Sequence, residues 1–201
     1  MDLDKVEFIW ASEFIKKHPE YWETVLKLSM NASVQRVLRC SQIMGREEST
    51  SNPSAQILYP LMQAAYIHHL GANIAQLGMD QRKVNVLARE VAEKLGYAKP
   101  IVVSHHMLMG LGEPPKEELT GADRGIALKM SKSKPDSAIF MTDSEQDIKR
   151  KISKAYCPEK KADENSVMEY AKYIVFEKFS GIEIKRPEKF GGNLKISSYD
   201  E

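Results

Sequence analysis

Two lysines on a loop of small residues are the most informative chemical feature of the sequence. Lys129 and Lys132 flank Met130 and Ser131, and Ser133 follows them. Lysine ammonium groups are compact point charges, and serine hydroxyls and backbone N–H groups add further phosphate contacts. When the α-phosphorus of a nucleoside triphosphate is attacked, pyrophosphate leaves, and nearby cations stabilise the charge that develops on it. The motif therefore predicts chemistry at a triphosphate, although a Lys-x-x-Lys pair taken alone is more often an exposed loop.

A β-α-β unit is the clearest of the elements that would position such chemistry. Residues 73–77 are predicted to form a strand, Asp80 can cap the helix that follows, and Gly96 ends that helix before a second strand at residues 100–104. Strands joined in this way are parallel, and ligands of such sheets lie at the carboxyl ends of the strands. The turn at residues 77–81 is therefore a second candidate site.

The other elements are predicted from helical periodicity and from turn residues. We expect a short strand at residues 6–10 and helices at residues 19–44, 55–70 and 166–179. A further helix carries Ile148, Ile152 and Ala155 after a Thr142–Glu145 capping box. A polar loop is expected at residues 46–53 and a long polar connection at residues 110–128. The fold class is therefore α/β. We expect a partial Rossmann-like parallel sheet within residues 1–137, and a mainly helical segment at residues 138–201.

Composition sets limits on the class of protein. The 201 residues are 28% charged and 42% apolar, and 29 basic residues face 28 acidic ones, so any nucleic-acid surface must be local. Cys40 and Cys157 are far apart, which favours a reducing compartment over a disulfide framework. No apolar run is long enough to span a membrane, and the first five residues are acidic rather than basic. We expect a cytoplasmic protein that does not bind membranes.

Six segments, in order along nearly the whole chain, resemble tyrosyl-tRNA synthetases of the archaeal and eukaryotic kind, which are class I aminoacyl-tRNA synthetases. They are Tyr-Pro-Leu-Met-Gln (59–63), Gly-Met-Asp-Gln-Arg-Lys (78–83), Leu-Ala-Arg-Glu (87–90), KMSKSKPDSAIF (129–140), Ala-Tyr-Cys-Pro (155–158) and KRPEKFGG (185–192). The resemblance implies that residues 1–137 are the C-terminal part of the nucleotide-binding catalytic domain. It implies that residues 138–201 are an incomplete helical segment on the anticodon side.

The same resemblance assigns an amino-acid site and a ribose site. It implies that Tyr59, Gln63 and Gln81 surround the amino group of the bound amino acid, and that Tyr66 lies on the same helix face as Gln63. Asp80 would bind the ribose hydroxyls of the adenylate, because a carboxylate can accept from two vicinal hydroxyls. Its simpler role is that of a helix cap, and the two roles are compatible.

The resemblance also assigns phosphate, adenine and tRNA contacts. It implies that Lys129 and Lys132, with Ser131 and Ser133, act on the phosphates of ATP, which is the implied cofactor together with Mg²⁺. Residues 107–111, including Met109 and Leu111, would lie along the adenine, unless they are ordinary packing at a strand end. Phe190 would stack on an anticodon base, although a lone aromatic is more often part of a core. The five histidines show no spacing typical of metal ligands.

The sequence departs from the family at two places. An H-I-G-H-like motif is absent from its expected position, so we expect the chain to begin midway through the nucleotide-binding fold; His68-His69-Leu70-Gly71 lies inside a predicted helix and is rejected as that motif. Tyr66 stands where the family has an aspartate that accepts a hydrogen bond from the tyrosine phenol. A site built around such a bond derives much of its selectivity from it. Asn73 also replaces a usual aspartate.

These features leave three hypotheses. The first is a tyrosine–tRNA ligase, which activates tyrosine with ATP and transfers it to tRNA-Tyr, with this chain supplying part of the active site. The second is a degenerate, non-catalytic copy that binds tRNA or a partner. The third is a synthetase with a different amino-acid preference. The expected partners are tRNA-Tyr, tyrosine, and either a second copy of the chain, through the helix at residues 26–44, or a complementary N-terminal chain.

Overall fold

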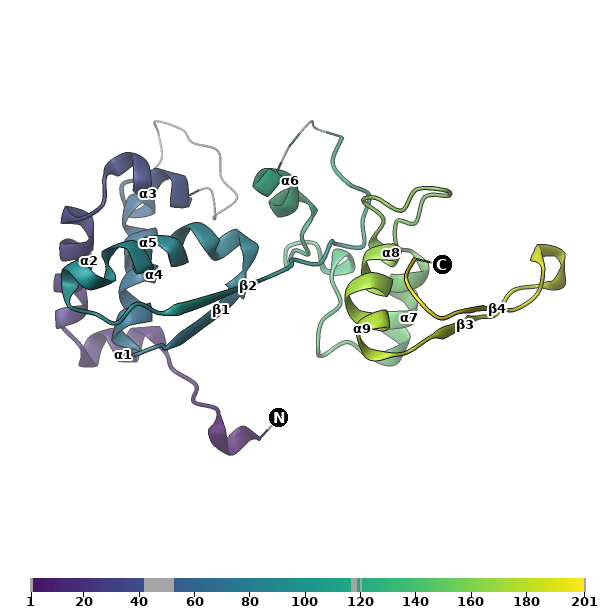
Figure 1. Ribbon diagram of the computed structural model, residues 1–201, viewed down its shortest axis with the longest axis horizontal. Coiled ribbons are helices and arrows are strands. Elements are labelled where there is room, and N and C mark those ends of the chain that lie inside the picture. Colours follow the sequence, from purple (N-terminus) through teal and green to yellow (C-terminus); the bar gives the residue numbers. More distant parts are fainter. Residues whose placement is uncertain (1, 42–52, 117–118, 120, 201) are drawn as a thin grey trace. The chain divides into compact units, whose positions relative to one another are not determined.

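The computed structural model describes residues 2–41, 53–116, 119 and 121–200. The chain forms two compact units, Met1–His106 and Met107–Glu201, which contain different elements (Figure 1). The expected functional boundary near residue 137 stays a prediction. The expected loop at residues 46–53 lies outside the described residues except for Pro53.

The first unit is a helical layer on a pair of strands. Its elements are α1 (Ala11–Lys17), α2 (Glu20–Met30), α3 (Val34–Ser41), α4 (Ala55–His69), β1 (Ile74–Gly78), α5 (Arg82–Ala92) and β2 (Ile101–His105). Helix α4 contacts α2, α3 and α5. Apolar side chains of α2, α4 and α5 form the core, among them Tyr21, Val25, Leu28, Leu61, Ala65, Leu87 and Val91.

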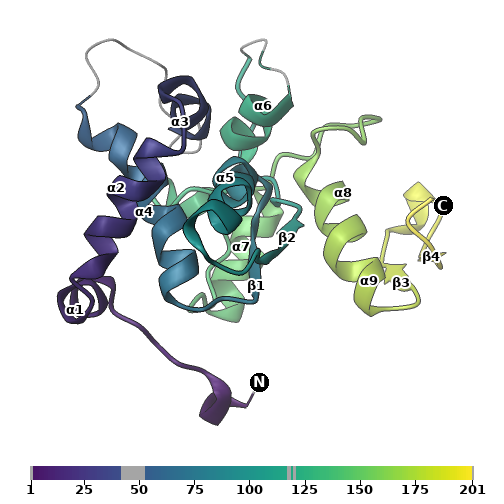
Figure 2. The ribbon, with the colours of Figure 1, turned by 60° about the vertical axis from the view of Figure 1, so that its left-hand side comes forward.

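The predicted β-α-β unit is confirmed. Strands β1 and β2 are parallel and in register from Ile74 opposite Ile101 to Gly78 opposite His105. Helix α5 lies beside the strand pair, as Figures 1 and 2 both show. Gly96, at φ +76°, ends the helical segment in the left-handed conformation that a C-terminal glycine adopts without strain. The turn at residues 77–81 therefore lies at the carboxyl end of β1, as expected.

Two predictions in the N-terminal region are wrong. The helix expected at residues 19–44 is two helices, because Asn31 Nδ2 donates to Lys27 O (2.9 Å) at the end of α2, and Ser33 Oγ accepts from Arg36 N (3.2 Å) at the start of α3. Both side chains compete with continued helix formation. Residues 6–10 are extended but belong to no strand, and Phe8 and Trp10 are 81% and 73% exposed.

The second unit contains α6 (Gly121–Leu128), α7 (Glu145–Ser153), α8 (Ser166–Tyr170), α9 (Phe176–Lys178), β3 (Ile182–Ile184) and β4 (Leu194–Ile196). A π-helical turn, Ala171–Val175, joins α8 to α9, which confirms the helix expected at residues 166–179. Strands β3 and β4 form an antiparallel hairpin within the segment expected to be mainly helical. None of the helices in the described ranges has both the length and the apolar character needed to cross a membrane.

Two further expectations are corrected in the second unit. The long connection at residues 110–128 contains α6, because Arg124 forms two hydrogen bonds with Glu164 (2.7 and 2.9 Å) and one with Pro115 O (2.7 Å). These tertiary bonds override the weak helix propensity of Gly121 and Gly125. Helix α7 is capped by Ser144, whose Oγ accepts from Asp147 N (3.1 Å), and not by Thr142.

Candidate functional site

The residues expected around the amino acid lie together in the first unit. A pocket of about 390 Å³ is lined by Tyr59, Gln63 and Tyr66 of α4, together with apolar side chains that include Phe14, Ile15, Met62 and Leu70. Gln63 is 4% exposed, and its Nε2 donates to Gln81 Oε1 at 2.9 Å. Tyr59, Gln63 and Tyr66 of α4 therefore share one pocket, and a hydrogen bond connects it to Gln81 in a separate segment of the sequence.

The chemistry of this pocket is that of phenols and apolar groups. No carboxylate is among its lining residues. Burial raises the pKa of Tyr66 to about 12, so this phenol stays protonated at neutral pH. Tyr21, which also lines the pocket, donates its hydroxyl hydrogen bond to Met62 O (2.8 Å). The pocket can therefore enclose an aromatic or aliphatic side chain, but it offers a substrate hydroxyl no charged acceptor.

Asp80 lies on the 3-10 turn Met79–Gln81, between β1 and α5. The N-cap residue of α5 is Gln81, whose side chain makes no cap bond. A short turn separates Asp80 from the helix, which sequence spacing alone did not reveal. Its predicted ribose contact is compatible with its place at the carboxyl end of β1. His68 and His69 belong to α4, as expected, and His68 stacks on Tyr97 with ring centroids 4.7 Å apart.

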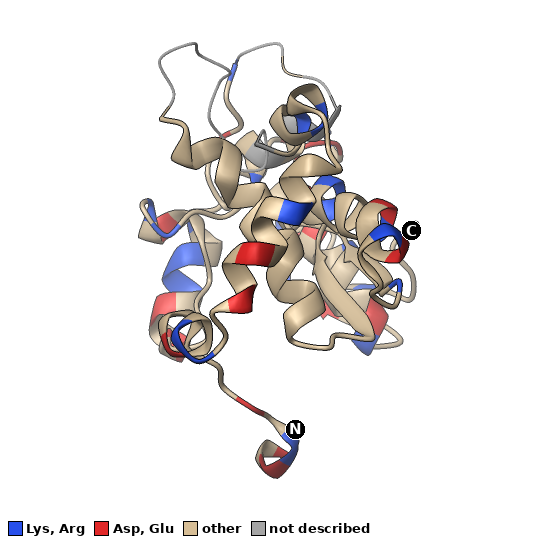
Figure 3. Cartoon of the chain, turned by 90° about the vertical axis from the view of Figure 1, so that its left-hand side faces the viewer, with Lys and Arg blue, Asp and Glu red and all other residues tan. Residues whose placement is uncertain are grey.

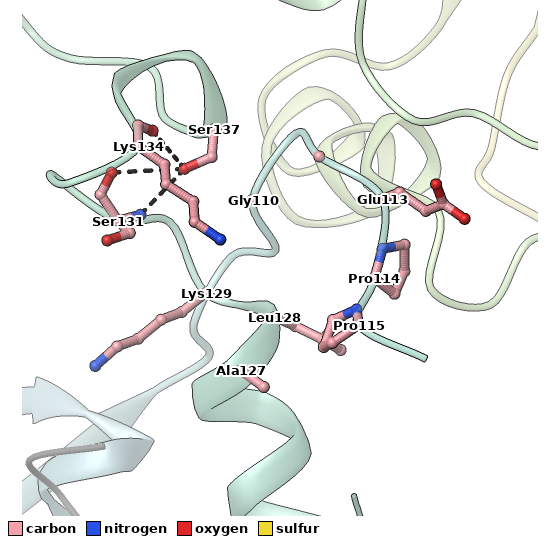
Figure 4. Close-up of a pocket in the computed structure, with 11 residues that line it drawn as sticks. Gly110, Glu113, Pro114, Pro115, Ala127, Leu128, Lys129, Ser131, Lys134 and Ser137 are labelled. Carbon is pink, nitrogen blue, oxygen red and sulfur yellow. Dashed lines mark hydrogen bonds between the residues drawn. The ribbon is translucent and has the colours of Figure 1, made fainter. Parts of the chain in front are cut away.

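The KMSKS loop, residues 129–133, forms one wall of a pocket in the second unit. This pocket has a volume of about 440 Å³, and Lys129 and Ser131 line it together with Gly110, Leu128, Lys134 and Ser137 (Figure 4). Ser131 Oγ and Ser133 Oγ are hydrogen-bonded at 2.8 Å. Lys132 and Ser133 are exposed and do not line the pocket. The structure thus brings together only part of the predicted phosphate-contacting group.

The segment expected to lie along adenine is joined directly to the KMSKS loop. Met109 and Lys129 form an antiparallel bridge, and Gly110 N donates to Leu128 O at 2.7 Å. Leu111 N donates to Ser137 O at 3.0 Å. Met109 and Leu111 are each 3% exposed, so their side chains pack inside the unit. Packing, the simpler role, is what the structure shows, and contact with adenine stays a prediction.

A buried ion pair follows the KMSKS loop in the chain, and it was not predicted from the sequence. Lys151 is 5% exposed; its Nζ donates to Asp143 Oδ2 (2.6 Å) and to Ala138 O (2.8 Å), and lies 4.7 Å from the centroid of the Phe140 ring. The hydrogen bond from Lys151 holds the pKa of Asp143 below its usual range. Lys151 follows Ile148 by three positions and therefore lies on the same helix face. A lysine on the apolar face of a predicted helix was the signal that could have identified this ion pair.

Phe190 lies at the tip of the C-terminal hairpin, in the turn Glu188–Phe190. It is 62% exposed, and Lys189 Nζ lies 5.0 Å from its ring centroid. Arg186 Nε donates to Gly192 O (2.9 Å) and closes the tip. An exposed ring beside a cation can stack on a base, whereas the core position that a lone aromatic more often takes is not observed.

A basic groove on the first unit was also missed. It has a volume of about 210 Å³, and it is lined by Arg36, Arg39, Arg82, Lys83, Val86 and Glu90. Elsewhere positive and negative residues are interspersed along the chain (Figure 3), as expected for a net charge of +1. In the sequence these four cations lie in two separate segments, and only the packing of α3 against α5 brings them together. Within the described ranges, no three His, Cys, Asp or Glu side chains form a metal-binding group.

Comparison with known proteins agrees with this geometry. The family model described as "tRNA synthetases class I (W and Y)" matches residues 1–201. The chain is 43% identical to a tyrosine–tRNA ligase of Thermococcus sibiricus and 48% identical to the cytoplasmic tyrosine–tRNA ligase 1 of Arabidopsis thaliana. All of the chain is covered in both cases, but only 57% and 50% of these relatives, so the chain spans about half their length.

The solved structures give the same result. The tyrosyl-tRNA synthetase of Pyrococcus horikoshii, complexed with L-tyrosine, superposes with a TM-score of 0.86 at 41% identity, over 99% of this chain and 57% of that one. A tryptophanyl-tRNA synthetase of Aeropyrum pernix, at 21% identity and a TM-score of 0.58, shares the fold. The chain therefore belongs to the class I family of tryptophanyl- and tyrosyl-tRNA synthetases.

Proposed function

We propose that this chain supplies the KMSKS loop and part of the amino-acid site of a tyrosine–tRNA ligase. The observation that carries the proposal is the pocket on α4, where Tyr59, Gln63 and Tyr66 lie together and Gln63 is hydrogen-bonded to Gln81. The pocket is large enough for an amino-acid side chain. The Pyrococcus relative with bound L-tyrosine supports the choice of tyrosine as the substrate.

Each group has a role in the proposed reaction. Tyr59, Gln63 and Gln81 provide hydroxyl and amide groups for the amino group of the substrate, and Asp80 accepts from the ribose hydroxyls. The substrate carboxylate attacks the α-phosphorus of ATP, and pyrophosphate leaves. Lys129 and Lys132 then stabilise the negative charge that builds on the leaving oxygens. Mg²⁺ would be held mainly through the phosphates of ATP and would add positive charge there.

The proposed RNA partner is tRNA-Tyr. Phe190 offers an exposed ring for an anticodon base, and the groove of Arg36, Arg39, Arg82 and Lys83 offers cations for backbone phosphates. A second copy of the chain or a complementary N-terminal chain completes the proposed assembly. A cytoplasmic location is part of the proposal, in line with the name of the Arabidopsis relative.

One observation favours a second candidate function. None of the described residues that line the α4 pocket carries a carboxylate, and Tyr66 is one of these residues. A degenerate copy that binds tRNA or a partner without activating tyrosine would tolerate both features. Its function would then depend on its RNA-facing residues and not on its amino-acid pocket.

The two functions are separated by a fusion experiment. The part of the Thermococcus sibiricus enzyme that this chain does not cover, which we expect to be mainly N-terminal, is joined ahead of residue 1, and amino-acid-dependent pyrophosphate exchange is measured. Tyrosine-dependent exchange that falls by about a hundredfold or more in the Lys132→Ala variant supports the ligase. Retention of tRNA-Tyr on filters without any exchange supports the non-catalytic module instead.

A further inference from the structure

The pocket beside the KMSKS loop contains a lysine that lies outside the five-residue motif. Lys134 lines this pocket together with Ser131, Ser137 and Lys129. In Figure 4 the Lys134 side chain extends from the loop toward Gly110, whereas the Lys129 side chain points away from Ser131 and Lys134. Of the two lysines among the described residues that line this pocket, Lys134 is the one whose side chain extends toward Gly110.

A tight turn fixes the backbone of Lys134. Lys134 N donates to Ser131 O (3.1 Å), and Lys134 O accepts from Ser137 N (2.8 Å) and from Ser137 Oγ (2.7 Å). In the part of the chain that the structure describes, no hydrogen bond or ion pair involves the Lys134 ammonium group. The backbone is thus held while the charged group remains available to a ligand.

The charges and shape around Lys134 favour an anion with an apolar end. Glu113 lines the same pocket, but Figure 4 shows its carboxylate directed away from the Ser131 side. Pro114, Pro115 and Leu128 form an apolar part of the wall, and the hydroxyls of Ser131 and Ser137 lie beside Lys134. A volume of about 440 Å³ is within the range of small-molecule sites.

We infer that Lys134 binds the pyrophosphate portion of a nucleoside triphosphate, as a third cation beside Lys129 and Lys132. This inference rests on the proposed function, because it assigns another residue to the same ATP site. The ammonium group would contact the β- and γ-phosphate oxygens, and the apolar wall would lie toward the base. A charge-assisted bond of this kind strengthens as negative charge builds on the leaving pyrophosphate.

The test is a titration of the ¹⁵N-labelled 201-residue chain, followed by amide chemical shifts. The probes are Mg-ATP, inorganic tripolyphosphate and adenosine, and the variants are Lys134→Gln, Lys134→Arg and, as a matched control, Lys149→Gln. Lys149 is an exposed lysine of the same unit that pairs with Glu145 (2.7 Å). We expect Lys134→Gln to weaken tripolyphosphate and Mg-ATP binding by about tenfold, Lys134→Arg to restore most of it, and Lys149→Gln to change it less than about twofold. Adenosine binding should be the same in all of them.

Other outcomes overturn the inference. Equal effects of Lys134→Gln and Lys149→Gln would show that only general charge matters. Shifts near Ser131 that are absent even at millimolar tripolyphosphate would show that the pocket takes no oligophosphate. A loss confined to binding of a short RNA duplex would assign Lys134 to RNA. If Lys129→Gln and Lys132→Gln weaken Mg-ATP binding while Lys134→Gln does not, the inference fails and the proposed function stands.

Discussion

Tyr66 lines the candidate amino-acid pocket, and none of the described lining residues carries a carboxylate. We predict that Tyr66→Asp strengthens tyrosine binding by the fused protein by about tenfold, with little gain for phenylalanine. The new carboxylate accepts a charge-assisted hydrogen bond from the substrate phenol, and removal of the ring opens space for the substrate. Calorimetric titration with both amino acids measures the effect.

The control for this change is Tyr66→Phe, which keeps the ring and removes only its hydroxyl. It should leave the preference between tyrosine and phenylalanine nearly unchanged. Tyr66→Asp also has a destabilising effect where neighbouring side chains pack against the tyrosine, because it leaves a cavity and a partly desolvated charge. Tyrosine binding that is unchanged or weaker in a folded Tyr66→Asp protein would mean that this pocket does not take the substrate ring.

Lys151 makes the contacts that we expect to stabilise the segment after the KMSKS loop. We predict that Lys151→Met lowers the melting temperature by roughly 5 °C or more, because Asp143 and Ala138 O lose their donor. Lys149 is exposed and pairs with the exposed Glu145, so Lys149→Met should leave the melting temperature nearly unchanged. Thermal denaturation followed by circular dichroism measures both variants, and equal melting temperatures would contradict the prediction.

The same pair makes a prediction about pH. Because the folded state lowers the pKa of Asp143, this carboxylate contributes stability that is fully present above its unfolded pKa and is lost as pH falls through the folded pKa. The difference in melting temperature between the wild type and Asp143→Asn should therefore shrink as the pH is lowered through the acidic range. A difference that stays constant with pH would contradict this.

At the scale of elements, the approach of two segments depends on Gly110. A Cβ atom built there would lie 3.2 Å from Ser137 O and 3.3 Å from Leu128 O, whereas one at Gly112 would meet nothing within 4 Å. We predict that Gly110→Ala destabilises the protein by about 1–3 kcal/mol, since backbone atoms must move. Gly112→Ala is the matched control and should be neutral or slightly stabilising. Chemical denaturation compares the two, and equal free energies of unfolding would contradict the prediction.

Local signals explain which elements could be predicted from the sequence. The β-α-β unit has apolar strands, a clear helical stripe and a terminal glycine, and all of these act over a few residues. Helix α6 could not be predicted in the same way, because it depends on Arg124 binding Glu164, forty residues away. The break between α2 and α3 was missed because the apolar spacing continues on both sides of Asn31. The cap of α7 was misplaced by two residues because Thr142 and Ser144 both fit a capping pattern.

The candidate site follows the same division. The residues of α4 and the KMSKS loop were identified from their motifs, and the structure brings Tyr59, Gln63 and Tyr66 to one pocket. Lys134, Lys151 and the basic groove were not predicted, because their surroundings depend on how separate segments pack: residues 110–115 lie beside Lys134, residues 138–143 beside Lys151, and α5 beside α3. Sequence motifs therefore predict the site residues that are close together in the sequence, whereas the other parts of the site arise from tertiary packing.

At the scale of the whole molecule, the two candidate pockets belong to different units. The amino-acid pocket belongs to Met1–His106 and the KMSKS loop to Met107–Glu201, and the chain corresponds to 57% of its Thermococcus relative. Adenylate formation requires donors on every side of the triphosphate as charge moves to the leaving group. We therefore predict that the 201-residue chain alone shows no useful tyrosine-dependent pyrophosphate exchange.

The expected size of the effect follows from the contacts that the rest of a full-length relative would add. Each lost transition-state donor typically costs about a hundredfold or more in rate, and the losses multiply. Exchange should therefore be at background for the purified chain, and it should rise when the N-terminal part of the Thermococcus enzyme is added as a separate polypeptide. The complete Thermococcus enzyme is the positive control, and the Lys132→Ala chain with the added part is the negative one. Exchange by the chain alone near the rate of the complete enzyme would show that its own residues suffice for adenylation.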